Sequence, residues 1–378
     1  MRLLIATDAW HPQVNGVVRS LEQMAKAGPG LGVSPSFVTP LLFRSVPLPG
    51  YREIRLSLVT SRSIAPHWRA FGPTHVHIAT EGPIGLAVRR LCLSERRPFT
   101  TSYHTRFPEY LAARLPVPPA LSYAWLRRFH NAASGTMVST PSLERDLADR
   151  GFRNLMRWTR GVDTELFRPR AAPEPEALRG LPRPLFLFVG RLAVEKNVAA
   201  FLSLDLPGTK VLVGDGPDRA RLQAEHPGAR FLGTLTGEAL ARAYAAADAF
   251  VFPSLTDTFG IVLLEALASG LPIAAYPVTG PLDVVGETRV GVLDRDLRQA
   301  ALGALQIPRE RCRAEALRYT WAESARQFYR NIEVAHAKGP ADRRAKGPAD
   351  RRAKGPAGGR ATRTAPLAAD PGSRPREG

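Results

Sequence analysis

Cysteine is scarce in this sequence: only Cys92 and Cys312 occur in 378 residues, and they lie far apart. This excludes a disulfide-rich scaffold and a zinc site of closely spaced cysteines, and it is typical of the reducing cytoplasm. Uncharged apolar runs of the roughly 18–20 residues that a transmembrane helix needs are also missing. The first residues, MRLLIATDAWHPQ, have only a short apolar run. They predict a β-strand rather than a signal peptide.

Acidic residues are fewer than basic ones, and the imbalance is uneven along the chain. Lys and Arg number 52 against 34 Asp and Glu, a net charge of +18. Residues 1–165 carry 21 basic and 11 acidic residues, 166–336 carry 20 and 19, and 337–378 carry 11 and 4. The nearly neutral middle argues against a nucleic-acid binder. The basic first half suits an anionic membrane surface or an ordinary solvated Arg-rich surface, and charge alone leaves both open.

The C-terminal segment is built from a short repeat. AKGPADRR begins at Ala337, recurs at Ala345 and degenerates to AKGPAGGR at Ala353. Gly-Pro in each copy breaks helix and strand, and the segment has almost no large apolar side chains to bury. We therefore expect residues 337–378 to be a disordered basic tail. It is either a solvated repeat expansion or a tether to anionic lipid or RNA.

Apolar runs alternate with helical patterns along the rest of the chain. The runs that predict strands are residues 2–7, 75–79, 98–103, 135–140, 185–190, 210–215, 249–254 and 272–276. Helical patterns occupy 84–94, 219–225, 238–247 and 261–270. This alternation predicts an α/β protein with parallel sheets.

The strands fall into two groups, separated by the Pro-rich, charged segment 160–184. We expect two Rossmann-like domains that face each other across a cleft, at residues 1–165 and 166–336. The last helix is expected to pack back on the first domain. In such sheets, ligands bind outside the carboxyl ends of the strands.

The segment FVFPSLTDTFGIVLLEALASGLPIAAY, at 250–276, carries the strongest single pattern. It predicts a strand, a loop with Asp257, and a helix that starts near Phe259-Gly260. Free N–H groups at a helix start attract phosphate, and glycine lets the phosphate approach closely. Glu265 lies in the apolar run IVLLEALA, where a buried carboxylate needs donors. The vicinal hydroxyls of a ribose would supply them; an exposed Glu on an amphipathic helix is the alternative.

A second pattern, VGRLAVEKN at 189–197, follows a predicted strand directly. Arg191 and Lys196 would both lie at the carboxyl end of that strand, where two cations neutralise a diphosphate. Taken alone, a strand followed by Arg and Lys is equally compatible with surface placement. VGDGPDR at 213–219 has only two of the three glycines of a dinucleotide fingerprint, so NAD is not expected.

Together these segments resemble the GT-B type of nucleotide-sugar glycosyltransferase. Within it, they are similar to the retaining family that includes bacterial GDP-mannose-dependent α-mannosyltransferases acting on lipids and polyols. The resemblance runs from about residue 1 to 334. The matching segments are PQVNGVVRSL (12–21), HIATEGPIGLAVR (77–89), TTSYHTRFPEYL (100–111), RGVDTELFRP (160–169), GRLAVEKN (190–197), VGDGP (213–217) and SLTDTFGIVLLEALASGLPIAA (254–275).

The resemblance implies a donor site made by both domains. Gly16 would leave room for the donor phosphate, Arg191 and Lys196 would bind the diphosphate, and Glu265 would hold the ribose. The loop and helix start complete the implied donor-binding set with Asp257, Phe259, Gly260 and Ile261.

The resemblance also implies which residues lie near the transferred sugar. His104, in SYHT, matches a histidine near the donor sugar, although by itself it is typical of a hydrogen-bonded histidine at a strand end. Asp257 stands where the family usually has Glu, one methylene longer, and would contact the sugar hydroxyls. The residues that we expect to act in catalysis are His104, Arg191, Lys196 and Asp257.

Neither a metal nor an organic cofactor is expected. His75 and His77 alternate on one strand, but no third ligand is evident nearby. Asp294 and Asp296 form an Asp-x-Asp pattern that we interpret as a helix cap. The resemblance agrees, because GT-B enzymes generally oppose the diphosphate with Arg, Lys and a helix N-terminus.

A basic, aromatic stretch, YAWLRRFHNAA at 123–133, allows two interpretations. It is typical of an amphipathic helix with Tyr123, Leu126 and Phe129 inward. It would also suit a helix resting on a membrane surface.

The expected activity is transfer of a hexose, mannose from GDP-mannose in the first instance, to a hydroxyl of a lipid or polyol acceptor, with retention. The protein is expected in the cytoplasm, with peripheral contact at the inner membrane face. Three alternatives remain open: a UDP-sugar-dependent transferase, a nucleotide-sugar 2-epimerase on the same fold, and a non-enzymatic binder of anionic surfaces on an inactive scaffold.

Overall fold

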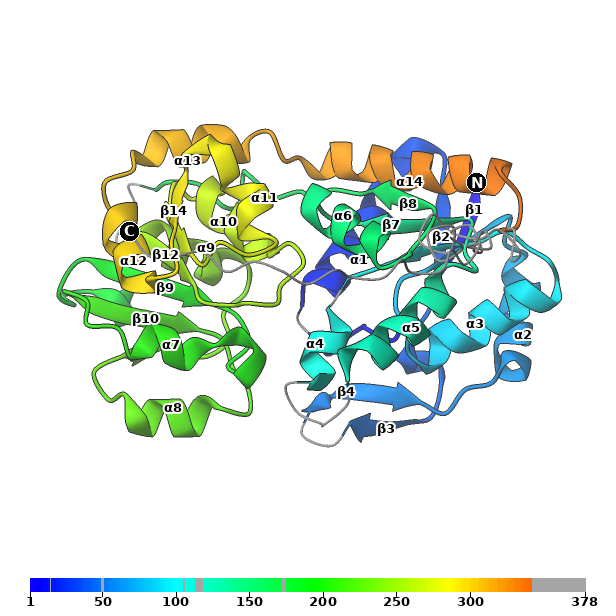
Figure 1. The fold of residues 1–378 in the computed structure, drawn as a ribbon, viewed down its shortest axis with the longest axis horizontal. Coiled ribbons are helices and arrows are strands. Elements are labelled where there is room, and N and C mark those ends of the chain that lie inside the picture. Colours follow the sequence, from blue (N-terminus) through cyan, green and yellow to red (C-terminus); the bar gives the residue numbers. More distant parts are fainter. Residues whose placement is uncertain (14, 49–50, 105, 113–117, 171–174, 342–378) are drawn as a thin grey trace, which may run out of the picture.

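Two α/β domains lie side by side in the computed structural model, which describes residues 1–13, 15–48, 51–104, 106–112, 118–170 and 175–341 (Figure 1). The expected α/β class with two parallel-sheet domains is confirmed. The expected disordered tail lies outside the described residues from residue 342 onward.

The first sheet is parallel throughout, with strand order β2-β1-β5-β6-β7-β8. Its strands are β1 (Arg2–Ala6), β2 (Ser34–Val38), β5 (His75–Ile78), β6 (Thr100–Ser102), β7 (Gly135–Val138) and β8 (Leu155–Arg157). A separate antiparallel hairpin is made of β3 (Ser45–Leu48) and β4 (Tyr51–Ser57).

The second sheet is also parallel, with strand order β11-β10-β9-β12-β13-β14. Its strands are β9 (Leu185–Val189), β10 (Thr209–Val213), β11 (Arg230–Phe231), β12 (Ala249–Phe252), β13 (Ile273–Ala275) and β14 (Gly291–Leu293). The strand order reverses between β1 and β5 in the first sheet and between β9 and β12 in the second. Ligands of such sheets bind at these reversals, beyond the carboxyl ends of the strands.

Helices connect the strands and cover both sheets (Figure 1). In the first domain they are α1 (Gly16–Ala27), α2 (Ser61–Phe71), α3 (Pro83–Ser94), α4 (Phe107–Ala112), α5 (Pro119–His130) and α6 (Pro141–Asp149). In the second they are α7 (Val198–Leu202), α8 (Arg219–Glu225), α9 (Gly237–Ala246), α10 (Ile261–Ala268), α11 (Pro281–Val284), α12 (Leu297–Ala304) and α13 (Arg309–Ala316). The last helix is α14 (Trp321–Ala337).

Helix α14 follows the second domain in sequence but packs on the first sheet (Figure 1). Phe328 lies 4.5 Å from the Trp158 ring, centroid to centroid, and both are buried. The Trp158 indole donates to Ser324 Oγ at 3.1 Å. The C-terminal helix therefore completes the core of the first domain.

The chain crosses between the domains twice, and the two crossings are joined. Val162 N donates to the Tyr319 carbonyl at 3.0 Å, and Val162 pairs with Thr320 in a parallel bridge. At Gly161 an added Cβ would lie only 2.4 Å from Trp321 N. Glycine here lets the two backbones touch.

The strands and helices predicted from sequence are confirmed, with ends that differ by at most two residues. The sequence analysis missed β2, β8, β11, β14 and the β3–β4 hairpin. Several of these strands are only two or three residues long, too short to show a period of two. Strand β2, SPSFV, is polar at one end and carries a proline, as an edge strand can.

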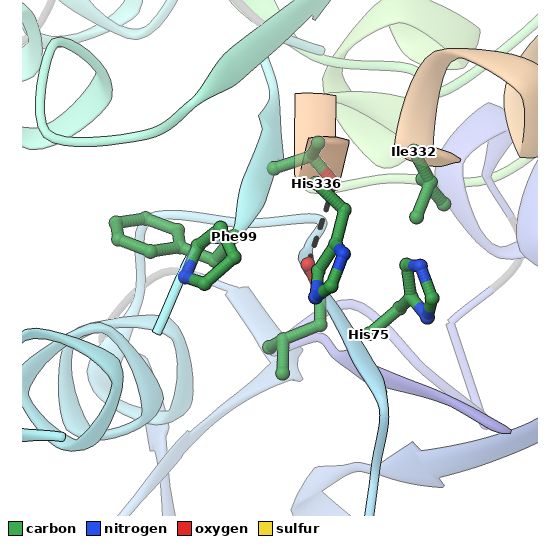
Figure 2. A pocket seen from close by; sticks show the side chains of 7 residues that line it. His75, Phe99, Ile332 and His336 are labelled. Atoms are coloured by element: carbon green, nitrogen blue, oxygen red, sulfur yellow. Dashed lines mark hydrogen bonds between the residues drawn. The ribbon is translucent and has the colours of Figure 1, made fainter. Parts of the chain in front are cut away.

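A small cavity lies at the amino ends of β5 and β6, beneath the end of α14 (Figure 2). Its lining includes His75, Phe99, Ile332 and His336, and it has no room for a water molecule. The cavity is at the opposite edge of the first sheet from the carboxyl ends where a ligand is expected.

Phe328→Ala should destabilise the first domain by about 3–5 kcal/mol, because it removes a buried aromatic side chain and leaves a cavity. The change is measured as the shift of the urea unfolding midpoint. Val334→Ala, on the same helix but 40% exposed, is the matched control. Equal shifts for the two variants would contradict the packing of α14 described above.

His77 makes stability depend on pH, because it is fully buried and its pKa is lowered to about 3 by burial and then by Arg160. The unfolded imidazole takes a proton below its ordinary pKa of 6.5, whereas the folded one stays neutral. Stability is therefore complete above pH 6.5 and decreases, by up to ~1.4 kcal/mol per pH unit, as the pH falls below it.

His77→Gln should make this decrease shallower in urea titrations between about pH 7.5 and pH 5. Glutamine can still bond Thr100 and Ser102, the present partners of the ring. His67→Gln, at an exposed position on α2, is the control. An unchanged slope in His77→Gln would show that this imidazole does not carry the effect.

Candidate functional site

The predicted site residues follow strands at the two points where the strand order reverses. Arg191 and Lys196 follow β9, and the loop with Asp257 follows β12. Gly16 follows β1 of the other domain, and His104 follows β6. Contacts described below join these segments, so the residues predicted at distant sequence positions meet where the domains face each other.

Lys196 and Asp257 form an ion pair at the carboxyl edge of the second sheet. Lys196 Nζ donates to the two carboxylate oxygens at 2.6 and 2.8 Å, and both side chains are largely buried. Asn197 Nδ2 donates to the Pro253 carbonyl at 3.1 Å, which links the two loops. Arg191 is half-buried at the end of β9. This edge therefore concentrates two cations and one carboxylate.

Helix α10 begins as the sequence predicted, at Ile261 with Gly260 before it. Gly260 has φ = 81°, the left-handed region that favours glycine. Among the described residues, no side chain caps this helix start. Its first N–H groups and positive dipole end are therefore available to an anion.

Gly16 brings the first domain against this helix start. A Cβ added to Gly16 would lie 3.3 Å from Cδ1 of Ile261, which is tighter than ordinary contact. The first turn of α1 and the first turn of α10 therefore lie side by side across the domain boundary.

Glu265 is buried in α10, and its donors come from protein side chains. Tyr244 Oη donates to Oε2 at 3.0 Å, and Arg19 of helix α1 donates from Nη1 to Oε1. Burial raises the pKa of Glu265, and the Arg19 guanidinium and the Tyr244 hydroxyl oppose this. The alternative interpretation, an exposed Glu265 on an amphipathic helix, is wrong, because Glu265 is only 2% exposed. The sequence analysis missed Arg19 and Tyr244; Arg19 lies in PQVNGVVRSL, three residues after Gly16.

His104 is held by both domains. Its carbonyl accepts from Thr258 Oγ1 of the second domain at 2.6 Å, next to Asp257. Its Nδ1 lies 3.2 Å from Nη2 of the buried Arg160, whose guanidinium stacks 4.0 Å from the Trp158 ring centroid. Sequence reasoning missed Arg160, whose motif RGVDTELFRP was noted without a role.

The protonation state of His104 follows from these neighbours. Burial, followed by Arg160, holds the pKa of His104 well below its usual range, so the ring is neutral. A guanidinium only donates, so Nδ1 accepts and the proton is on Nε2. Within the described part of the chain, Nε2 is enclosed without a hydrogen-bond partner. The ring of His104 therefore carries its N–H on a buried atom, while its backbone carbonyl contacts Thr258.

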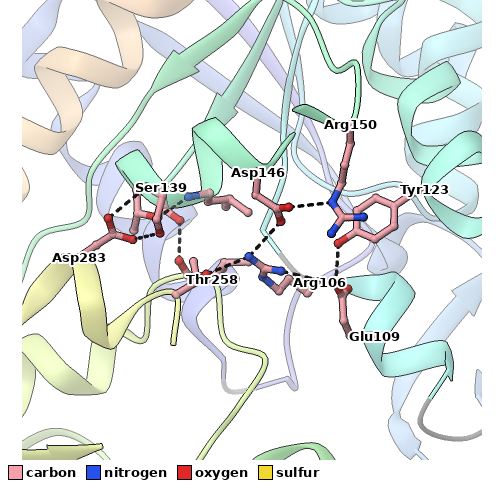
Figure 3. A network of polar contacts seen from close by, with 12 residues as sticks. Arg106, Glu109, Tyr123, Ser139, Asp146, Arg150, Thr258 and Asp283 are labelled. Atoms are coloured by element: carbon pink, nitrogen blue, oxygen red, sulfur yellow. Dashed lines mark hydrogen bonds and ion pairs between the residues drawn. The ribbon is translucent and has the colours of Figure 1, made fainter. Parts of the chain in front are cut away.

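A polar network also joins the domains beside His104 (Figure 3). Arg106 contacts Asp146 at 3.2 Å and donates to Thr279 of the second domain at 3.0 Å. Asp283 of α11 accepts from the backbone and the hydroxyl of Ser142 at the start of α6. These contacts fix how the loop after β6 meets the second domain.

The other patterns singled out in the sequence have structural partners. His77 bonds Thr100 and Ser102, and Asp296 caps α12 by accepting from two backbone N–H groups, as expected. No group of three or more His, Cys, Asp or Glu in the described ranges is arranged to hold a metal ion.

Helix α5 buries Tyr123, Leu126 and Phe129, as the amphipathic interpretation predicted. Among the described residues, no helix combines the length and apolar character needed to cross a membrane.

Comparisons with known proteins match both domains. The model described as Glycosyltransferase Family 4 matches residues 14–166, and the one described as Glycosyl transferases group 1 matches 183–307. A GDP-mannose-dependent alpha-mannosyltransferase of Mycobacterium tuberculosis (strain CDC 1551 / Oshkosh) is 34% identical over 320 residues. This alignment covers 78% of the present chain and 83% of the relative. The chain belongs to the same glycosyltransferase family as this relative.

Solved structures share the GT-B fold of this glycosyltransferase. Sucrose-phosphate synthase from Thermosynechococcus elongatus has a TM-score of 0.71 at 20% identity, covering 89% of this chain and 100% of that one. Anabaena HepE, solved in complex with UDP-glucose, has a TM-score of 0.66 at 15% identity, covering 88% and 100%. The two-domain arrangement is thus shared by distant sequences.

Gly16→Val should lower the turnover of the glycosyltransferase at least about tenfold, because the new side chain collides with Ile261 and pushes the domains apart. Turnover is measured with donor and acceptor at saturation. Gly30→Val is the matched control, since nothing lies within 4 Å of a Cβ at Gly30. Full activity of Gly16→Val would show that close contact here is dispensable.

Proposed function

We propose that this glycosyltransferase transfers mannose from GDP-mannose to a hydroxyl of a lipid or polyol acceptor, with retention at the anomeric carbon. The observation that carries the proposal is the meeting of Lys196, Asp257, Glu265 and the uncapped start of α10 at one sheet edge. The choice of mannose and GDP is supported by the mannosyltransferase that is 34% identical to this chain.

In this proposal the diphosphate of the donor lies at the start of α10. Arg191 offers a planar fork and Lys196 a compact charge, while the N–H groups of Gly260 and Ile261 point to the phosphate oxygens. Negative charge grows on the nucleoside diphosphate as the sugar leaves. Cations and amides that are already in place stabilise that charge without reorganising.

Asp257 and His104 lie on either side of Thr258 and are assigned to the sugar. Lys196 holds the Asp257 carboxylate in place by two hydrogen bonds, although this side chain is one methylene shorter than the Glu usual in the family. The Nε2–H of His104, which is enclosed in this structure, donates to a sugar hydroxyl once donor binding exposes it. Phe259 is buried beside the helix start and keeps that loop in place.

The acceptor is proposed to be a glycolipid at the inner membrane face. Residues 1–165 hold 21 basic against 11 acidic residues, and α5 exposes Leu121 and Trp125. Basic and aromatic side chains suit the headgroup region of an anionic membrane. The protein then works from the cytoplasm without crossing the bilayer.

A UDP-sugar donor is the alternative with a specific observation behind it, since HepE was solved with UDP-glucose. A 2-epimerase on this fold would form product from donor alone, so incubation without acceptor separates it from a transferase. A non-enzymatic binder of anionic surfaces would show salt-sensitive lipid affinity but no donor binding.

Donor identity is tested by the melting temperature of the protein with GDP-, UDP- and ADP-sugars. GDP-mannose should raise it most, because a ligand at about 100 times its Kd stabilises the folded state by ~2.7 kcal/mol. A larger shift with UDP-glucose would favour the alternative donor. No shift with any nucleotide sugar would overturn the proposed function.

Lys196→Ala should lower turnover about 10²–10³-fold, the usual effect of removing one group that stabilises charge in the transition state. The melting temperature is measured alongside because the largely buried Asp257 loses its partner, and turnover should fall far more than any loss of folded protein explains. Lys26→Ala, at an exposed position of α1, is the control for loss of a lysine. An unchanged rate would remove Lys196 from the mechanism.

A further inference from the structure

We propose that Arg19 binds the donor by exchanging partners: it moves from Glu265 to the diphosphate when a ribose takes its place on the carboxylate. This rests on the proposed function and adds to it a cation supplied by the first domain. Neither the sequence patterns nor the resemblance gave Arg19 a role.

The starting point is the Arg19–Glu265 ion pair, which spans the two domains. The Glu265 side chain is 3% exposed, whereas the Arg19 side chain is 30% exposed. Arg19 extends from α1 of the first domain, while Tyr244 belongs to α9, within the same domain as Glu265. Of the two donors, Arg19 is therefore the one that can leave without disturbing the core of the second domain.

A ribose bound at Glu265 competes with Arg19. Two vicinal hydroxyls donate best to the two oxygens of one carboxylate, and both oxygens already accept, one from Arg19 and one from Tyr244. The Tyr244 hydroxyl is fully buried within the second domain and its other acceptor, the Val262 carbonyl, lies at 3.5 Å, so displacing it from Glu265 is costly. Of the two donors that already surround the carboxylate, the guanidinium is thus the one that an incoming ribose can displace.

The displaced guanidinium has a new partner close by. Arg19 lies three residues after Gly16, on the same side of α1, and Gly16 contacts Ile261 at the start of α10. Arg19 and Glu265 lie about one turn further along each helix. The helix starts are thus side by side, and the proposed diphosphate position is only about one helical turn, ~5.4 Å, from the present pair.

The exchange keeps charges compensated. Glu265 loses a cation but gains two hydroxyl donors, and the diphosphate gains a fork of N–H groups that matches its oxygens. Nucleotide binding then replaces the direct Arg19–Glu265 contact between the domains by contacts of each residue with the bound nucleotide. Arg19 would consequently hold the first domain on the donor.

The exchange predicts opposite effects of Arg19 on two ligands. Arg19 opposes a nucleoside, which carries only the ribose, and favours a nucleoside diphosphate. In Arg19→Met, guanosine should bind more tightly and GDP about tenfold or more weakly, as expected for the loss of a charge-assisted hydrogen bond. Arg19→Lys keeps the positive charge but not the planar guanidinium fork. It should therefore weaken the binding of GDP less than Arg19→Met does.

The experiment measures the affinities of guanosine and GDP for the full-length protein by calorimetry or ligand-observed NMR, with melting temperature as the check on folding. Arg157→Met is the matched control, because it breaks an Arg–Glu pair, with Glu144, inside the first domain. The control should bind both ligands as the parent does.

Two results would overturn the exchange. Tighter binding of both ligands to Arg19→Met would make Arg19 a competitor only, and weaker or unchanged binding of guanosine would show that it does not occupy the ribose position. Failure of the parent protein to bind GDP or UDP is a different result, which contradicts the proposed function itself.

Discussion

The site is organised around the buried carboxylate of Glu265. Glu265 is buried among apolar residues of α10, and a charge in such surroundings is costly unless donors reach it. Tyr244 supplies one donor from the same domain, and Arg19 supplies another from the opposite domain. Compensation of the Glu265 charge therefore links the core of the second domain to Arg19 on helix α1 of the first domain.

The contacts around this pair explain why the site needs both domains. Gly16 meets the start of α10, the His104 carbonyl accepts from Thr258, and Asp283 bonds the start of α6. Each contact joins the end of a strand in one domain to a loop or helix start in the other. Parallel sheets place such loops at one edge, so two sheets with facing edges bring together residues that are distant in sequence.

The architecture and the residues of the second domain could be predicted from sequence because they follow local patterns. An apolar run, a glycine and an amphipathic helix are enough to place Asp257, Gly260 and Glu265 after β12. The family resemblance added Gly16 and His104, which no local pattern singles out. Their proposed roles in binding and catalysis go beyond what the fold itself establishes.

Partnerships across the domain boundary could not be predicted, because no periodicity encodes them. Arg19 is one of many arginines in a basic segment, and nothing in its neighbourhood points to Glu265. Arg160, which sets the tautomer of His104, lies in a segment that was interpreted as a linker. Short strands such as β11 could not be predicted for a different reason, because two residues cannot show an alternation of apolar and polar side chains.

The paired crossings at Val162 and Thr320 have a mechanical consequence. The two chain segments between the domains are hydrogen-bonded to each other and touch at Gly161. They therefore act as one hinge and not as two independent linkers. Rotation about that hinge remains open to the molecule, whereas sliding and twisting apart would break the bridge. This hinge lies directly beside Arg160, whose side chain contacts His104, so a swing of one domain against the other turns about a point next to that contact.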